Sequence, residues 1–98
     1  MTQPSHPVPV HVPEKSHFEV VEPEGTAVLV YERGDGVVVL EHTVVPDELE
    51  GRGVGTALAR AGLAWAAQQH LAVVPQCSFV QAFLEKHPGE IPVEIRSA

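Results

Sequence analysis

The chain has 98 residues and a mass of 10.5 kDa, which is enough for one small domain. Its net charge of −7 argues against nucleic-acid or anionic-membrane partners, because both present phosphate charge. A single cysteine, Cys77, excludes an internal disulfide and every metal site built from several cysteines. No apolar run approaches the roughly 20 residues of a membrane span. The N-terminus also lacks a signal pattern, so we expect a cytoplasmic protein.

Proline dominates the N-terminal segment. Four of the nine prolines fall within the first thirteen residues, and proline disfavours both helices and central strands. We therefore predict that residues 1–15 form an extended tail and that residues 16–98 form the folded domain. His6 and His11 lie in this tail without the fixed geometry that a metal site needs, so we predict no bound metal ion.

The first half of the domain has the pattern of β-strands. Three runs rich in β-branched residues predict strands at 18–21, 26–32 and 37–45, and the second run is apolar enough to be buried on both faces. Pro23-Glu24-Gly25 predicts a turn between the first two strands. Arg33-Gly34-Asp35-Gly36 predicts a tight hairpin between the second and the third.

The second half changes to a helical period. A helix is predicted from about Gly53 to Gln69, with apolar residues recurring on one face at Val54, Leu58, Ala61 and Trp65. A short strand at 72–74 and a helix at 79–86, capped by Ser78, follow it. The strand–helix–strand order predicts a right-handed βαβ unit in which 37–45 and 72–74 are parallel neighbours. The predicted fold class is α/β, with a mixed, mostly antiparallel sheet.

Every second residue is a glycine in the loop between the strongest predicted strand and the long helix, at Gly51, Gly53 and Gly55. A helix N-terminus carries free N–H groups and partial positive charge, and glycine lets an anion approach the backbone. The pattern predicts a phosphate or pyrophosphate cradle. A glycine-rich helix entry without a ligand is the structural alternative. Thr56 stands where the dinucleotide fingerprint needs glycine, and the loop lacks the lysine of an ATP-binding P-loop, so both nucleotide motifs are excluded.

The loop Gly51-Arg52-Gly53-Val54-Gly55-Thr56 resembles the acyl-CoA pyrophosphate loop of the GNAT superfamily of N-acetyltransferases. The chain as a whole resembles the short, single-domain GNAT-like proteins over residues 17–90. The other shared features are Val28-Leu29-Val30-Tyr31, His42-Thr43-Val44-Val45-Pro46, and Val74-Pro75-Gln76-Cys77 before a helix that ends in His87-Pro88. Glu50 departs from the superfamily pattern, which commonly has Gln or Arg there. A carboxylate at this position repels a pyrophosphate unless it points away.

The resemblance implies a GNAT-like fold with acetyl-CoA as cosubstrate and no metal. It implies that the loop backbone at Gly51, Arg52, Gly53, Val54, Gly55 and Thr56 holds the pyrophosphate. It also implies that the backbone at Val44 and Val45 pairs with the pantetheine arm. The helices that wall the acceptor site in full-length members are missing. We therefore expect the acceptor amine, a small molecule or a protein, to bind a shallow site or one shared with a partner such as a second copy of the chain.

Two routes of acetyl transfer are open. His42, two residues before the expected thioester contact, is the candidate base for direct attack by a bound amine. Cys77, before a helix start where the dipole favours a thiolate, is the candidate nucleophile of a covalent route. Each also has a structural interpretation, as a histidine satisfied within the sheet and as a small buried thiol. The sequence predicts an acetyl-CoA-binding N-acetyltransferase for an unidentified amine. The alternative is a non-catalytic CoA-binding or protein-interaction module.

Overall fold

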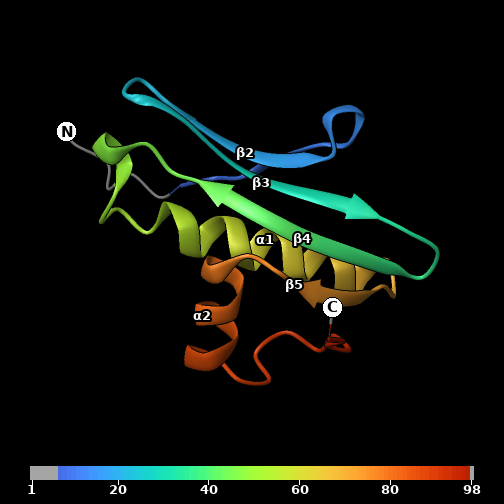
Figure 1. Ribbon diagram of the computed structural model, residues 1–98. Helices are drawn as coiled ribbons and strands as arrows, with labels where there is room; N and C mark the ends of the chain where they lie inside the picture. Colours follow the sequence, from blue (N-terminus) through green and yellow to red (C-terminus); the bar gives the residue numbers. More distant parts are fainter. Residues whose placement is uncertain (1–6, 98) are drawn as a thin grey trace.

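The computed structural model describes residues 7–97, which form a mixed α/β fold (Figure 1). One sheet has the strand order β1-β2-β3-β4-β5: Val10–Val12, His17–Glu22, Gly25–Arg33, Val37–Val44 and Ala72–Pro75. Helix α1, Val54–Gln68, connects β4 to β5, and helix α2, Ser78–Lys86, follows β5. Short 3-10 helices stand at Pro13–Lys15 (η1) and Asp47–Leu49 (η2).

The sheet has the predicted topology. Strands β1 to β4 pair antiparallel in chain order, whereas β4 and β5 pair parallel with α1 as the crossover. Antiparallel neighbours need only short turns, but a parallel pair needs a long connection, which the helix supplies. The predicted fold class, a mixed and mostly antiparallel sheet with a βαβ unit, is confirmed.

The sheet begins inside the segment that the sequence assigned to the tail. Val10 pairs with Glu19 and Val12 with His17, so β1 is an edge strand beside β2. Pro9 and Pro13 flank this strand rather than interrupt it, and an edge strand needs a hydrogen-bonded partner on one side only. Residues 10–15 are therefore part of the folded domain, while His6 lies outside the described residues.

Strand β3 is buried on one face, not on both as its apolar run predicted. Ala27, Leu29 and Tyr31 are buried, and Val28 and Val30 between them are only half-buried. The difference arises because α1 packs on one face of the sheet and leaves the other face uncovered across β2 to β4 (Figure 1). No helix among residues 7–97 is long and apolar enough to cross a membrane.

Close packing fixes α1 on the sheet. A Cβ atom added at Gly62, in the middle of the helix, would lie 2.9 Å from Cδ2 of Leu29 on β3. A glycine inside a helix lowers the stability of the helix by about 1 kcal/mol relative to alanine. Gly62 is nevertheless explained here, because a larger residue would prevent α1 from packing this closely on β3.

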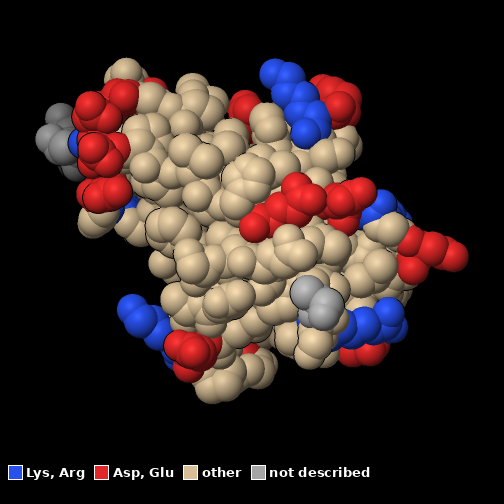
Figure 2. All heavy atoms as spheres, viewed as in Figure 1, with Lys and Arg blue, Asp and Glu red and all other residues tan. Residues whose placement is uncertain are grey.

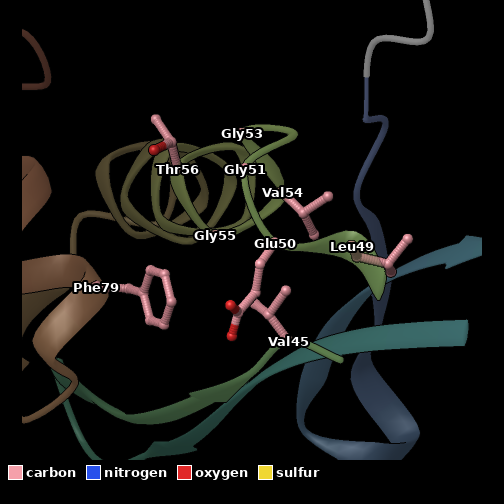
Figure 3. A pocket seen from close by; sticks show the side chains of 9 residues that line it. All are labelled: Val45, Leu49, Glu50, Gly51, Gly53, Val54, Gly55, Thr56 and Phe79. Atoms are coloured by element: carbon pink, nitrogen blue, oxygen red, sulfur yellow. The ribbon is translucent and has the colours of Figure 1, made fainter. Parts of the chain in front are cut away.

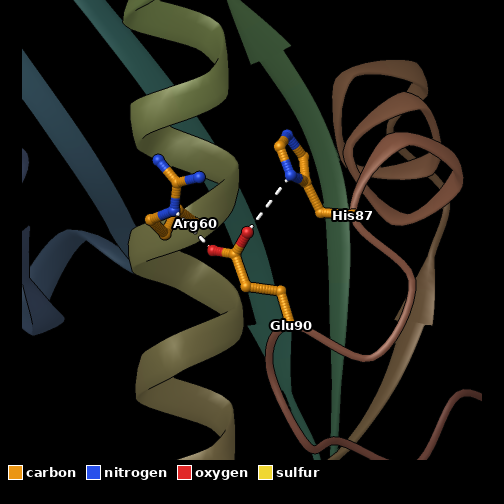
Figure 4. A network of polar contacts seen from close by, with 3 residues as sticks. All are labelled: Arg60, His87 and Glu90. Carbon is orange, nitrogen blue, oxygen red and sulfur yellow. Dashed lines mark hydrogen bonds and ion pairs between the residues drawn. The ribbon is translucent and has the colours of Figure 1, made fainter.

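A polar network holds α2 beside the N-terminal half of α1 (Figure 4). Arg60 on α1 donates from Nε to Oε2 of Glu90 at 2.9 Å, and the other oxygen of Glu90 lies 3.1 Å from Nδ1 of His87. The Arg60 guanidinium also lies 5.1 Å from the ring centre of Phe83, a buried residue of α2. The hydrogen bond from Arg60 lowers the pKa of Glu90. These contacts attach the C-terminal end of α2 to α1.

An aromatic cluster attaches β1 to the rest of the fold. The His11 ring stacks on Phe18 with 4.3 Å between ring centres and lies 4.9 Å from Trp65. A hydrogen bond of 2.7 Å joins Nε2 of His11 to the Tyr31 hydroxyl. Burial lowers the pKa of His11, partly opposed by the charge of Glu14. Burial also raises the pKa of Tyr31.

Lowering the pH from about 7 to about 5 is expected to destabilise the fold through His11. Because its folded pKa lies below the unfolded value of 6.5, the unfolded chain binds more protons in this window. The stability that neutral His11 contributes is present above pH 6.5 and is lost as the pH falls through the lowered pKa. Urea unfolding midpoints across this range measure the loss.

The variant His11→Gln is expected to flatten this pH dependence, whereas His42→Gln, at an exposed histidine, is expected to retain it. Equal pH slopes in the two variants would contradict the assignment to His11. The pKa values of three carboxylates, Glu24, Glu90 and Glu94, are lowered from 4.5, so most of the stability that they contribute is lost below this window.

Candidate functional site

The glycine loop presents free backbone amides at the start of α1. Gly51 and Gly53 have φ values of +81° and +78°, in the left-handed region that favours glycine, and Gly53 is the N-cap of the helix. The bond from the Ala57 N–H to the Gly53 carbonyl, 3.0 Å, is the first of the helical pattern. The amides of residues 54–56 precede that bond and have no partner within the helix. The loop therefore has the geometry of an anion cradle.

A cavity of about 380 Å³ opens at this loop (Figure 3). Its lining residues are Val45, Leu49, Glu50, Gly51, Gly53, Val54, Gly55, Thr56 and Phe79. The structure thus gathers six of the residues predicted to bind the coenzyme, and it adds Leu49, Glu50 and Phe79 to them. Buried Leu49 holds the start of the loop against the core, which positions the glycines beside the end of β4.

Gly55 has a packing role that the sequence interpretation did not include. A Cβ atom at this position would lie 2.3 and 2.4 Å from two ring atoms of Phe79, the second residue of α2. The missing side chain therefore makes room for the aromatic ring, whereas a Cβ at Gly51 or Gly53 would meet no atom within 4 Å. Of the three glycines, only Gly51 and Gly53 leave bare backbone facing open space.

Glu50 places a carboxylate inside the mouth of the cavity. Figure 3 shows its side chain pointing into the space between Val45 and Phe79 rather than away from it. Repulsion from this charge acts on any anion in that part of the cavity. An anionic ligand is therefore favoured only on the side of the mouth formed by the helix amides.

Arg52 and Val44 do not line this cavity. The Arg52 guanidinium pairs with Glu24 in the turn between β2 and β3, with 3.2 Å from Nη2 to Oε2. This contact contributes to the lowered pKa of Glu24, after a larger effect of a backbone hydrogen bond. Val44 is 53% exposed. The Arg52 side chain thus anchors the loop to the neighbouring turn.

Strands β4 and β5 separate where the predicted nucleophile lies. Their ladder ends at the pair Leu40–Pro75, and the Leu40 carbonyl accepts from the N–H groups of both Gln76, at 3.1 Å, and Cys77, at 3.0 Å. Strand β4 runs on to Val44 while the chain beyond Cys77 turns into α2. Within residues 7–97, the part of β4 beyond Leu40 has no strand partner on the side where β5 lies.

Cys77 is buried at the N-cap position of α2, one residue before the predicted cap Ser78. Its Sγ lies 2.8 Å from Oγ1 of Thr43 on β4, in a contact where either group can donate the hydrogen. A threonine hydroxyl in this place can donate to a cysteine thiolate and stabilise its charge. Thr43 is therefore a partner of Cys77 that the sequence did not indicate.

His42 lies on the opposite face of the sheet from Cys77. A β-bulge explains this: Val30 pairs with His42 and Tyr31 with Leu40, which leaves Glu41 as an extra residue. Strict alternation from the buried Leu40 would turn His42 toward the helices, but the bulge turns it away and turns Thr43 inward instead. The structure therefore does not bring His42 and Cys77 together.

Comparisons with known proteins agree with this geometry. The GCN5-related N-acetyl-transferase family matches residues 17–92, nearly the segment over which the resemblance was predicted. Protein NATD1 of Bos taurus is 40% identical over 63 residues, which cover 63% of this chain and 56% of that protein. The Homo sapiens protein of the same name is 38% identical over the same shares, and that of Danio rerio is 35% identical over 63% of this chain and 57% of its own.

The aligned segment thus spans little more than half the length of these relatives. The family match covers most of the chain and includes the glycine loop, β4 and Cys77. The chain belongs to the GCN5-related N-acetyltransferase family.

Proposed function

We propose that the chain binds acetyl-CoA in the cavity beside α1 and transfers the acetyl group to an amine. The observation that carries this proposal is the set of free amides at residues 54–56, which open into a cavity at the end of β4. A helix N-terminus of this kind binds phosphate through its N–H groups and its dipole, without a basic side chain. Membership in a family that generally uses acetyl-CoA supports the same ligand.

The local geometry fits a diphosphate on one side of the mouth. The space in front of Gly51 and Gly53 is open, because a Cβ atom at either would meet no atom within 4 Å. Glu50 occupies the other side, between Val45 and Phe79. We therefore place the diphosphate against the amides of the loop and the helix, away from the carboxylate.

The unpaired edge of β4 supports a place for the pantetheine arm. Beyond Leu40 the backbone groups on this side have no strand partner among the described residues, and Val45 already lines the cavity. An extended ligand carrying amide groups can pair with such an edge as an added strand does. The backbone at Val44 and Val45 remains our candidate for this contact and for polarising the thioester carbonyl.

His42 and Cys77 then represent two separate mechanisms, because they lie on opposite faces of β4. A histidine on the exposed face suits proton removal from an amine that approaches from solvent. Cys77, within 2.8 Å of the Thr43 hydroxyl, suits attack on the thioester from the helix side. The contact with Thr43 favours the covalent route, in which the acetyl group passes through Cys77 before it reaches the amine.

A non-catalytic CoA-binding or protein-interaction module is the second candidate function. Two observations favour it: the Glu50 carboxylate in the mouth and the burial of Cys77, which is only 4% exposed. The two functions differ in turnover, not in coenzyme binding.

Calorimetric titration with CoA tests the shared part of both functions. We expect a dissociation constant well below about 1 mM, and we expect pantetheine, which lacks the diphosphate, to bind much more weakly. Binding of CoA weaker than about 1 mM, or equal binding of pantetheine, would contradict a diphosphate cradle. Acetyl transfer to a panel of amines then separates the functions, because CoA binding with neither turnover nor an acetyl adduct indicates the module.

A further inference from the structure

A second cavity of about 380 Å³ lies at the opposite end of α1 from the glycine loop, where η1 and the end of β3 meet the last turns of the helix (Figure 1). Its volume is within the roughly 300–1,000 Å³ of small-molecule sites. Among its lining residues are His11, Ser16, Tyr31, Arg33, Trp65 and Gln69. It shares no lining residue with the coenzyme cavity, so the two sites are separate.

Backbone hydrogen bonds shape one rim of this second cavity. The Ser16 N–H donates to the Pro13 carbonyl at 3.0 Å, and the Ser16 carbonyl accepts from the Tyr31 N–H at 3.0 Å. Ser16 has a φ of +53°, a left-handed conformation that is costly for a residue other than glycine. The two bonds join η1 to β3 and hold Ser16 in this conformation, so the fold itself defines the rim.

The wall of the cavity is largely aromatic. The ring centre of Trp65 lies 4.8 Å from that of Tyr31 and 4.9 Å from that of His11. A hydrogen bond of 2.7 Å between Nε2 of His11 and the Tyr31 hydroxyl holds these two rings in place. Burial lowers the pKa of His11, so its ring is mostly uncharged at neutral pH. The wall thus offers flat, neutral surface against which a planar group can pack.

Arg33 gives the cavity a full positive charge. Its side chain is exposed, and its guanidinium carbon lies 5.7 Å from the ring centre of Trp65. The other three arginines each pair with a glutamate: Arg52, Arg60 and Arg96. Arg33 has no carboxylate within 4 Å among residues 7–97. Its N–H donors are therefore available to a ligand.

The lining of the cavity differs in charge from the rest of the molecule. The chain has a net charge of −7, and Figure 2 shows acidic side chains over much of one face with fewer basic ones between them. No aspartate or glutamate lines this cavity; Glu14 acts on the pKa of His11 but is not part of the lining. The C-terminal end of α1 contributes about half a negative charge, which the full charge of Arg33 exceeds. The cavity therefore favours an anion whose charged end lies at Arg33.

We propose that this cavity binds a small aromatic carboxylate, with its ring against Trp65 and its carboxylate on Arg33. The guanidinium fork matches two carboxylate oxygens, and the indole matches a flat apolar ring. The Ser16 hydroxyl and the Gln69 amide can add hydrogen bonds at the rim. A cationic ligand is disfavoured despite the aromatic wall, because Arg33 already places positive charge there.

This site goes beyond the proposed acetyl transfer. Trp65 is eleven residues along α1 from Val54, a distance of about 16 Å at 1.5 Å per residue. A carboxylate bound here would therefore leave the loop amides free for CoA.

The test is a titration of the full chain with benzoate, followed by tryptophan fluorescence. Trp65 is the only tryptophan of the chain, so the signal comes from the wall of this cavity. We expect a saturable change. Benzamide has nearly the same shape and no charge, and it is expected to bind about tenfold more weakly. Acetate has the charge without the ring, and it is expected to give no saturable change over the same concentrations.

Three variants at exposed arginine positions test the assigned contact. Arg33→Gln is expected to weaken benzoate binding about tenfold, and Arg33→Lys, which keeps the charge but loses the fork, is expected to have an intermediate affinity. The control Arg96→Gln removes the same charge from a site where the arginine pairs with Glu94, and it is expected to leave benzoate binding unchanged. Amide chemical shifts of the isotope-labelled chain are expected to change at β1, η1 and the last turns of α1.

Four outcomes would overturn the inference. They are equal affinity for benzoate and benzamide, equal weakening in Arg33→Gln and Arg96→Gln, a stronger response to tetramethylammonium than to benzoate, and amide shifts confined to the glycine loop. A CoA titration in saturating benzoate separates this site from the proposed function. We expect unchanged CoA affinity, and displacement of CoA by benzoate would place the anion in the coenzyme cavity instead. Failure of CoA to bind at all would contradict the proposed function alone.

Discussion

Replacing Gly53 with leucine is expected to weaken CoA binding by about 100-fold, because a side chain there lies in front of the amides that we assign to the diphosphate. Loss of two amide–phosphate hydrogen bonds, each contributing about 1.5 kcal/mol, accounts for this factor. The new residue would also be strained, since Gly53 has a φ value of +78°. Calorimetry with CoA measures the affinity, and urea unfolding measures the strain.

Gly36 offers a matched control for the strain. It has a φ value of +73°, its Cβ would also meet no atom within 4 Å, and it lies at the opposite end of β4 from the glycine loop. Gly36→Leu is therefore expected to lose about the same 1–2 kcal/mol of stability while it keeps full affinity for CoA. If both variants lose affinity equally, the effect comes from the fold and the cradle assignment is wrong.

The regular elements follow from local sequence patterns, which is why most of them could be predicted. The local composition and hydrophobic period of the β3–β4 hairpin, of strand β4 and of helix α1 each favour the structure that is observed. Tertiary contacts therefore do not have to override the local preference in these elements. Strand β1 had no such pattern. Three residues between prolines pair only because β2 presents a free edge and because His11 can stack on Phe18.

The glycine loop was predictable for a similar reason, but the roles of its glycines were not. The spacing of Gly51 and Gly53 is a local property that sets up a helix N-terminus. Gly55 depends on Phe79, which is 24 residues away in the sequence and reaches the loop only because α2 packs beside α1. The sequence contains no pattern that pairs these two residues.

The relation between His42 and Cys77 could not be obtained from the sequence at all. A single extra residue in β4, Glu41, reverses which side chains face the helices after Leu40. Bulges have no reliable sequence pattern, so alternation places His42 on the wrong face and hides Thr43. The consequence for mechanism is direct, because the two candidate groups are assigned to different routes.

Acetyl-CoA is expected to leave an acetyl group on Cys77, seen as an increase of about 42 Da in the intact mass. In this step the Cys77 thiolate forms a bond to the acetyl carbon, the bond from that carbon to the CoA sulfur breaks, and CoA leaves as its thiol after taking up a proton. The variant Cys77→Ser is expected to lose the adduct completely, since a hydroxyl is a far weaker nucleophile. It retains a group that can bond to Thr43, so urea unfolding is expected to show little change.

Thr43→Val tests whether the contact at 2.8 Å takes part in this chemistry. The substitution removes the hydroxyl and keeps the branched shape, and we expect adduct formation to slow by about tenfold, the effect of one hydrogen bond to a charged group. His42→Gln, on the opposite face, is expected to form the adduct at the normal rate.

If Cys77→Ser still acetylates amines while His42→Gln does not, the amine attacks the thioester directly. Cys77 would then be a buried small side chain that holds the start of α2 against β4.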